Sequence, residues 1–121
     1  MRNDMPHTKG HTGNAAMDQC IEDCHDCAAT CNACITHCLT KGGKHAAPEH
    51  ITLLIDCATA CQAAEASMSR QSSVHASVCA SCAEICRLCE ESCRAMGDDP
   101  MMKECAEACR RCAESCEKMA A

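Results

Sequence analysis

The stretch CIEDCHDCAATCNACITHC, residues 20–38, decides the fold, because its cysteines follow one another at alternating steps of four and three residues. Side chains at this average spacing of about 3.5 residues lie on one face of an α-helix. The same alternation recurs in CASCAEICRLCEESC, residues 79–93, and in CAEACRRCAESC, residues 105–116, while a shorter segment carries Cys57 and Cys61. The pattern predicts helices whose cysteine faces turn toward one another.

All 17 cysteines of the chain belong to these four segments. They are Cys20, Cys24, Cys27, Cys31, Cys34, Cys38, Cys57, Cys61, Cys79, Cys82, Cys86, Cys89, Cys93, Cys105, Cys109, Cys112 and Cys116.

The composition predicts a single domain with an unusual core. The chain has 121 residues, enough for one shared core, and it contains no Phe, Tyr or Trp. Burial of the few branched aliphatic side chains contributes too little to offset chain entropy by itself. Ala, Met and Cys must therefore fill most of the interior, and a bound metal ion would add to its cohesion.

Charge and hydropathy indicate which partners to expect. The formal net charge of −6 comes without a clustered basic face, so we expect no nucleic-acid partner. The sequence shows no apolar stretch suited to a membrane span or a signal peptide, and residues 1–19 are polar. We therefore expect a cytoplasmic protein with no membrane partner, in a reducing compartment where cysteines bind metals more often than they form disulfides.

Helix signals divide the chain into a flexible polar tail, residues 1–16, which contains His7 and His11, and a helical domain, residues 17–121. The expected helices run from near Met17 to Thr40, from Pro48 to about Arg70, from a cap at Ser72 or Ser73 to Met96, and from Pro100, capped by Asp98 or Asp99, to the chain end. Short connections between four such helices predict an all-α fold, an antiparallel up-down-up-down four-helix bundle with a cysteine-lined core.

Three roles for the thiols compete. Successive cysteines on one helix face have parallel side-chain directions that suit disulfides poorly, and an odd number leaves one unpaired. Inert packing explains any single cysteine but not a long series in register, because Ala, Leu or Val would pack as well. Metal binding is the remaining role, and soft thiolates select Cu(I), Zn²⁺ or an iron-sulfur cluster.

Charge and spacing favour Cu(I) among these metals. Bridging thiolates that each serve two Cu(I) ions keep a loaded core near neutral, whereas a column of four-thiolate zinc sites would accumulate negative charge. No cysteine precedes a proline, as the bacterial ferredoxin pattern requires. An iron-sulfur or dithiol redox protein and a zinc or general thiol metal buffer remain as alternatives. Apart from the thiols, no nucleophile with an orienting base is evident, so we expect a binding protein and not an enzyme.

In this combination the sequence resembles the copper storage protein family, cysteine-packed bacterial four-helix bundles that take up many Cu(I) ions. The resemblance covers about residues 17–120 and is carried by the three alternating runs together with Cys57 and Cys61 on the cysteine-poor second helix. It implies cytosolic copper storage, a homotetramer of bundles, and Cu(I) held mainly by cysteine pairs within one helix.

The cysteines of each helix form a line, or seam, along one of its faces. Extending each seam outward in the same register reaches a methionine or a histidine, and these four residues should lie at one end of the bundle. These residues are Met17, Met68, His75 and Met119. We expect them to mark a metal entrance, since antiparallel packing gathers them.

The opposite extensions are Lys41, His50, Met96 and Met102. Aliphatic side chains near that level, among them Ile51, Leu54, Ile55, Leu39 and Leu88, predict a more closed end. His25 and His37 each adjoin a seam cysteine, which predicts that both lie on exposed helix flanks.

Overall fold

The computed structural model describes residues 12–121. Its α-helices are α1 (Ala15–Lys41), α2 (Pro48–Ser69), α3 (His75–Arg94) and α4 (Pro100–Ala120), and a short 3₁₀ helix, η1 (Gly43–Ala46), joins the first two. No strand occurs within this part of the chain. His7 and His11 lie outside the described residues.

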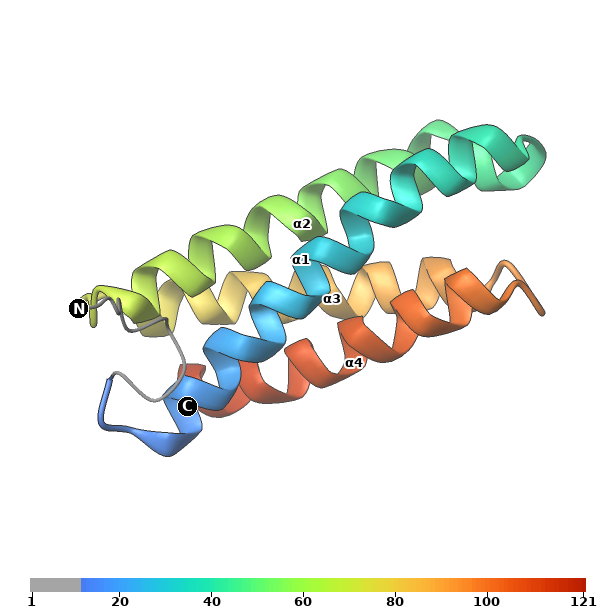
Figure 1. Cartoon of the computed structure of the whole chain (residues 1–121). Helices are drawn as coiled ribbons and strands as arrows, with labels where there is room; N and C mark the ends of the chain where they lie inside the picture. The colour runs from blue at the N-terminus through green and yellow to red at the C-terminus, as the bar shows by residue number, and fades with distance from the viewer. Residues whose placement is uncertain (1–11) are drawn as a thin grey trace, which may run out of the picture.

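The helices form the predicted antiparallel bundle (Figure 1). Each α-helix packs against two neighbours, in the cyclic order α1, α2, α3, α4 and back to α1. The start of α1, the end of α2, the start of α3 and the end of α4 lie together at one end of the bundle (Figure 1). None of the helices within residues 12–121 has the length and hydropathy needed to cross a bilayer.

Helix α1 begins at Ala15, two residues before the expected Met17. The side chain of Asn14 caps it by accepting a hydrogen bond of 3.0 Å from the Met17 amide. The helix ends one residue later than predicted, at Lys41, where the N–H of Gly42 donates to the Cys38 carbonyl oxygen at 3.1 Å. Gly42 has a φ of 77°, a conformation that glycine adopts without strain.

The turn between α2 and α3 is longer than the sequence suggested. Gln71 adopts a positive φ of 51°, and the N–H of Ser72 donates back to the Ser67 carbonyl oxygen at 3.0 Å. Helix α3 consequently starts at His75, after a capping position held by Val74 that offers no side-chain acceptor. The predicted cap at Ser72 or Ser73 was therefore wrong, because these residues belong to the turn.

Helix α4 begins as expected, with Asp99 as its cap. The carboxylate Oδ1 accepts hydrogen bonds from the amides of Met101 and Met102, at 2.9 and 3.2 Å. Helix α3 ends at Arg94, two residues before the predicted Met96. Asp99 itself is almost completely buried, which is unusual for a capping carboxylate.

The core consists mainly of sulfur and small side chains. All the cysteines are buried, and Ile21 and Leu54 are the only branched aliphatic residues that join them in the described core. Alanines such as Ala64 and Ala106, both fully buried, let neighbouring helices approach closely. Helix spacing is thus set by Cys and Ala and not by large apolar side chains.

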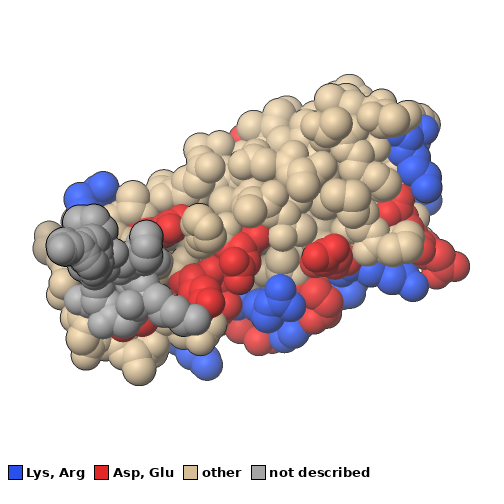
Figure 2. All heavy atoms as spheres, in the orientation of Figure 1, with Lys and Arg blue, Asp and Glu red and all other residues tan. Residues whose placement is uncertain are grey.

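Charged side chains lie on the outside of the bundle. On the face shown in Figure 2 they gather along the edge over α4, while the surface over α2 is largely uncharged. Arg94 of α3 contacts Glu90 on its own helix and Glu107 of α4, at 2.9 and 3.2 Å. Exposed pairs of this kind each stabilise a fold by about 0.2–1 kcal/mol, so the interior decides the stability.

We predict that Leu54→Ala destabilises the metal-free protein by about 2–5 kcal/mol, because Leu54 is fully buried in a core with few other large side chains. The matched control is Leu88→Ala, which truncates the same residue type where it is 49% exposed and should change stability by less than about 0.5 kcal/mol. Urea unfolding followed by circular dichroism measures both. Equal effects would show that Leu54 does not contribute to the core as described.

Candidate metal centre

The four α-helices place all 17 cysteines in the lumen, where none is more than 1% exposed. All of them are free thiols. The alternating steps of three and four residues keep each seam directed at the bundle axis, as the sequence predicted. The lumen is therefore a continuous column of thiols that is closed to solvent along its length.

Sulfur atoms meet across the whole section of the bundle. Between neighbouring helices, the Sγ atoms of Cys57 and Cys86 lie 3.7 Å apart. Across the diagonal from α2 to α4, the Sγ atoms of Cys61 and Cys112 lie 3.6 Å apart. Contacts along both directions mean that sulfur itself fills the lumen.

Pairs within one helix are also close. The sulfurs of Cys82 and Cys86 are 3.9 Å apart, and those of Cys112 and Cys116 are 4.0 Å apart. Most of the other sulfur contacts run between helices, whereas the family resemblance implied binding mainly within a helix. The column therefore offers sulfur pairs within one helix and sulfur pairs between helices.

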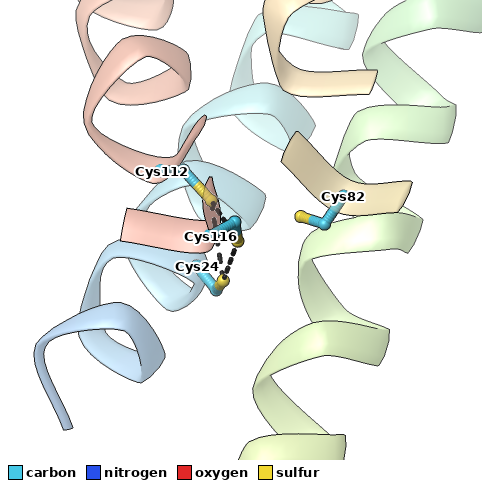
Figure 3. A group of neighbouring side chains, drawn as sticks. All are labelled: Cys24, Cys82, Cys112 and Cys116. Carbon is cyan, nitrogen blue, oxygen red and sulfur yellow. Dashed lines mark hydrogen bonds between the residues drawn. The ribbon is translucent and has the colours of Figure 1, made fainter. Parts of the chain in front are cut away.

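The thiols group into quartets with the geometry of a metal site. In one of them, Cys24 of α1, Cys82 of α3, and Cys112 and Cys116 of α4 turn their sulfurs toward a common point (Figure 3). All four Sγ atoms lie within 4.8 Å of one another, and Cys24 is 3.5 Å from Cys112. Four convergent soft ligands of this kind suit a thiophilic metal ion.

Successive quartets overlap along the column. Five of them are Cys24/Cys82/Cys112/Cys116, Cys61/Cys82/Cys86/Cys112, Cys27/Cys57/Cys61/Cys86, Cys27/Cys31/Cys57/Cys109 and Cys31/Cys89/Cys105/Cys109. Each quartet shares two cysteines with the next, so the five contain 12 different cysteines. Five separate four-thiolate sites would need 20 ligands. Metal ions that occupy all five quartets with four thiolates each must therefore share thiolates.

Two thiols near opposite ends of the column, Cys38 and Cys79, hold their protons more tightly than free cysteine does. Burial raises the pKa of the Cys38 thiol from its ordinary value of 9.0 to about 11, and the neighbouring Asp99 carboxylate adds to the effect. At the other end of the lumen, the hydrogen bond with Cys116, followed by burial, raises the pKa of Cys79 to about 12. Without a metal these thiols are neutral at physiological pH, which suits their burial.

The end formed by the last turn of α1 and the first turn of α2 brings together a thiol, an imidazole and a thioether. The Cys38 sulfur lies 3.4 Å from His50 Nε2 and 3.7 Å from the Met102 thioether sulfur. His50 Nδ1 lies 2.7 Å from the Ser92 hydroxyl, which orients the ring. Burial, and after it the nearby His45, lowers the pKa of His50, so that its ring is neutral and able to bind a metal. The sequence indicated only a mixed end here, because this convergence depends on three different helices.

The aliphatic side chains do not close that end as predicted. Leu54 is fully buried, but Leu39, Ile55 and Leu88 are 55%, 44% and 49% exposed. Leu39 and Leu88 each adjoin a seam cysteine, so a helical step of about 100° turns them away from the lumen. The prediction that aliphatic side chains close this end was wrong for these three residues.

The other end carries the residues expected to mark an entrance. Met17 and Met68 are buried, whereas His75 and Met119 are half-buried. The four helix termini that carry them lie together (Figure 1). His75 Nδ1 lies 2.9 Å from the Ser72 carbonyl oxygen within its own turn.

The two flanking histidines differ. His25 has a side chain that is 68% exposed, as predicted. His37 is only 26% exposed and lies 2.8 Å from the Asp99 carboxylate, so the prediction of an exposed flank was wrong for this residue. Asp99, the buried cap of α4, thus contacts α1, and the sequence pattern of neither helix predicts this contact.

Residues 13–121 match the family model described as copper storage protein. The chain belongs to the copper storage protein family. A Cu(I)-bound structure of the copper storage protein BsCsp3 is 39% identical, with a TM-score of 0.81, and the match covers 88% of this chain and 99% of that one. The copper storage protein Ccsp from Streptomyces lividans, loaded with 10 copper equivalents, is 34% identical with a TM-score of 0.82, over 97% and 92% of the two chains.

A third structure shows copper loading, with five coppers, to a cytosolic copper storage protein from Streptomyces lividans. It is 35% identical to this chain with a TM-score of 0.80, and the match covers 87% of this chain and 92% of that one. Membership of the family favours copper over the iron-sulfur and zinc alternatives. The many buried cysteines of the column are suited to copper binding.

For this copper storage family member we predict a loss of stability at alkaline pH that copper prevents. Because the pKa values of Cys38 and Cys79 are raised on folding, their contribution is fully present below the pKa of the unfolded thiol, about 9, and is lost as the pH rises toward 11–12. The urea midpoint of the metal-free protein, kept under reducing conditions, should fall between pH 8 and pH 11. Fully copper-loaded protein has no thiol protons to lose and is the control. Parallel declines in both forms would show that the thiols do not cause the effect.

Proposed function

We propose that this protein stores and sequesters many Cu(I) ions in the cytosol, with all 17 cysteines as ligands and without catalysing a reaction. The observation that carries the proposal is the overlap of the thiol quartets, which share two cysteines at each step. Shared ligands suit a metal that accepts few thiolates and tolerates bridging, and Cu(I) is such a metal. The copper-loaded relatives support the same ion.

Charge balance supports a high capacity. Each Cu(I) that enters replaces one thiol proton, so a core with about one ion per cysteine remains neutral. Zinc ions, each with four thiolates of its own, would leave two negative charges per site in a lumen whose cysteines are at most 1% exposed. The buried column therefore favours a monovalent soft cation over a divalent one.

We also propose that the bundle assembles into a homo-oligomer, a tetramer by resemblance to its family. The largely uncharged surface over α2 (Figure 2) and the exposed Ile55 on that helix support association through this side of the bundle. Light scattering of the purified protein measures the assembly directly. A monomer at micromolar concentration would contradict this part of the proposal.

We predict that anaerobic titration with Cu(I) in the presence of a competing chelator reaches a plateau on the order of one ion per cysteine. The loaded protein should absorb in the ultraviolet only, whereas an iron-sulfur protein would be brown. Replacing Cys24, Cys82, Cys112 and Cys116 together with Ala should lower the plateau in proportion to the cysteines removed. A plateau at a few ions per chain would instead indicate discrete sites and contradict storage.

The position of the entrance stays a prediction. We infer that Cu(I) enters at the end with Met17, Met68, His75 and Met119, because these residues extend all four ligand seams outward. Weak thioether and imidazole ligands there would pass ions inward without retaining them. The group of Cys38, His50 and Met102 gives the opposite end a comparable set of ligands, so the two ends require a direct comparison.

Replacing Met17, Met68, His75 and Met119 with Leu roughly preserves apolar volume and removes the soft ligands. Loading from a Cu(I) chelator should become slower, with little change in the final number of bound ions. The matched variant carries Leu at His50, Met96 and Met102. Slower loading in the matched variant alone would place the entrance at the opposite end, and unchanged rates in both would show that neither set transfers copper.

A further inference from the structure

A second group of potential ligands lies outside the thiol column, where the end of α1, the 3₁₀ helix η1 and the cap of α4 meet. The Asp99 Oδ2 atom lies 2.8 Å from His37 Nε2, 3.3 Å from His45 Nε2 and 3.3 Å from Lys41 Nζ. The other carboxylate oxygen, Oδ1, is occupied by the amides at the start of α4. Oδ2 is therefore the oxygen available to the imidazoles.

His45 is the unusual member of this group. The residue is 8% exposed, and its Nε2 atom is buried with no hydrogen-bond partner. Although Asp99 Oδ2 is only 3.3 Å away, the ring is not aligned to share a hydrogen with it. Leaving a buried polar atom without a hydrogen-bond partner typically costs about 1–3 kcal/mol of folding free energy. An unpaired nitrogen beside a carboxylate is therefore a candidate ligand for a cation.

We propose that His37, His45 and Asp99 form a binding site for a divalent cation of the Zn²⁺ class, separate from the Cu(I)-binding thiols. Two imidazole nitrogens and one carboxylate oxygen are a common ligand set for such ions, and water completes the coordination. The ligand set contains no sulfur and therefore suits a borderline divalent ion better than Cu(I).

The distances fit such an ion. Metal–nitrogen and metal–oxygen bonds of about 2.0–2.1 Å at a tetrahedral angle place the two ligand atoms about 3.3 Å apart. The separation between His45 Nε2 and Asp99 Oδ2 is 3.3 Å, and the His37 pair, at 2.8 Å, must lengthen by about half an ångström. The two imidazole rings lie 6.3 Å apart between centroids and nearly perpendicular, at 85°. Both rings thus approach the same oxygen from different directions.

The charges permit binding. The hydrogen bond from His37, supported by the Met102 amide and by Lys41, holds the pKa of Asp99 well below its ordinary range, so the carboxylate is ionised at neutral pH. Lys41 is the competing cation, but its side chain is 51% exposed and free to extend into solvent. With two neutral imidazoles and one carboxylate, a divalent ion would leave a single positive charge at the site.

A bound ion would cross-link three segments at the end of the bundle that also carries Cys38 and His50. His37 belongs to α1, His45 to η1, and Asp99 caps α4. Fixing them together would stabilise this end of the bundle. We therefore expect Zn²⁺ to raise the thermal midpoint of the copper-loaded protein.

The test is an anaerobic titration of the Cu(I)-loaded protein with Co²⁺, a spectroscopic substitute for Zn²⁺. Copper-thiolate clusters do not absorb in the visible range, so ligand-field bands of Co²⁺ are observable there. We expect about one equivalent of Co²⁺ per chain, displaced by Zn²⁺, without the sulfur-to-cobalt charge transfer that thiolate ligands produce.

The bands should disappear in His45→Ala and in Asp99→Asn, and the latter keeps a good helix cap. They should persist in His25→Ala, which removes an exposed histidine that also lies 3.3 Å from a carboxylate, Glu65. Absence of the bands in the parent protein, their persistence in both site variants, or their loss only when His7 and His11 are replaced would overturn the proposal.

Copper capacity, measured on the same variants, should equal that of the parent, because none of these substitutions replaces a cysteine. If the parent itself fails to load Cu(I), the storage function fails and the divalent site is then tested on metal-free protein. There, charge-transfer bands identify any Co²⁺ bound by thiolates, and bands that lack charge transfer and disappear in His45→Ala identify the proposed site.

Discussion

Contact between sulfur atoms in a lumen only a few ångströms wide is the constraint on which the rest of the structure depends. Sulfurs from diagonal helices, such as Cys61 and Cys112, lie 3.6 Å apart, so thiols fill the axis at this level. Alanines beside the seams allow the helices to approach this closely. Because the thiols that pack the core are also the proposed ligands, the shape of the core sets the geometry of the candidate metal centre.

The same thiols face opposing demands in the two states of the protein. Without metal, burial favours the neutral protonated form, and the pKa of Cys38 rises to about 11. A metal ligand must instead be a thiolate, whose charge is costly in the lumen unless a cation neutralises it. Exchange of a proton for a monovalent ion satisfies both demands, which explains how one buried column serves as a stable core before and after loading.

The two ends of the bundle differ in chemistry although the column between them is nearly uniform. One end carries methionines and His75, with His75 bonded within its own turn. The other combines Cys38, His50 and Met102 around the lumen and places His37, His45 and Asp99 just outside it. The thiol and thioether ligands of the lumen thus lie next to an imidazole and carboxylate group outside it, and the two groups meet at Cys38 and His37, consecutive residues of α1.

The alternating cysteine steps determined the helices and the inward direction of the thiols, because helical periodicity is a local property of the chain. The helix end signals and short connections determined the antiparallel bundle. The sequence did not reveal which sulfurs meet, since the shared quartets depend on the relative heights of four helices. The exposure of Leu39 and Leu88 follows from the same periodicity, because each adjoins a seam cysteine. The sequence did not show, however, that Asp99 is buried against His37 and His45. Those features depend on helix rotation and on a turn between helices, and only the packing of the complete bundle decides them.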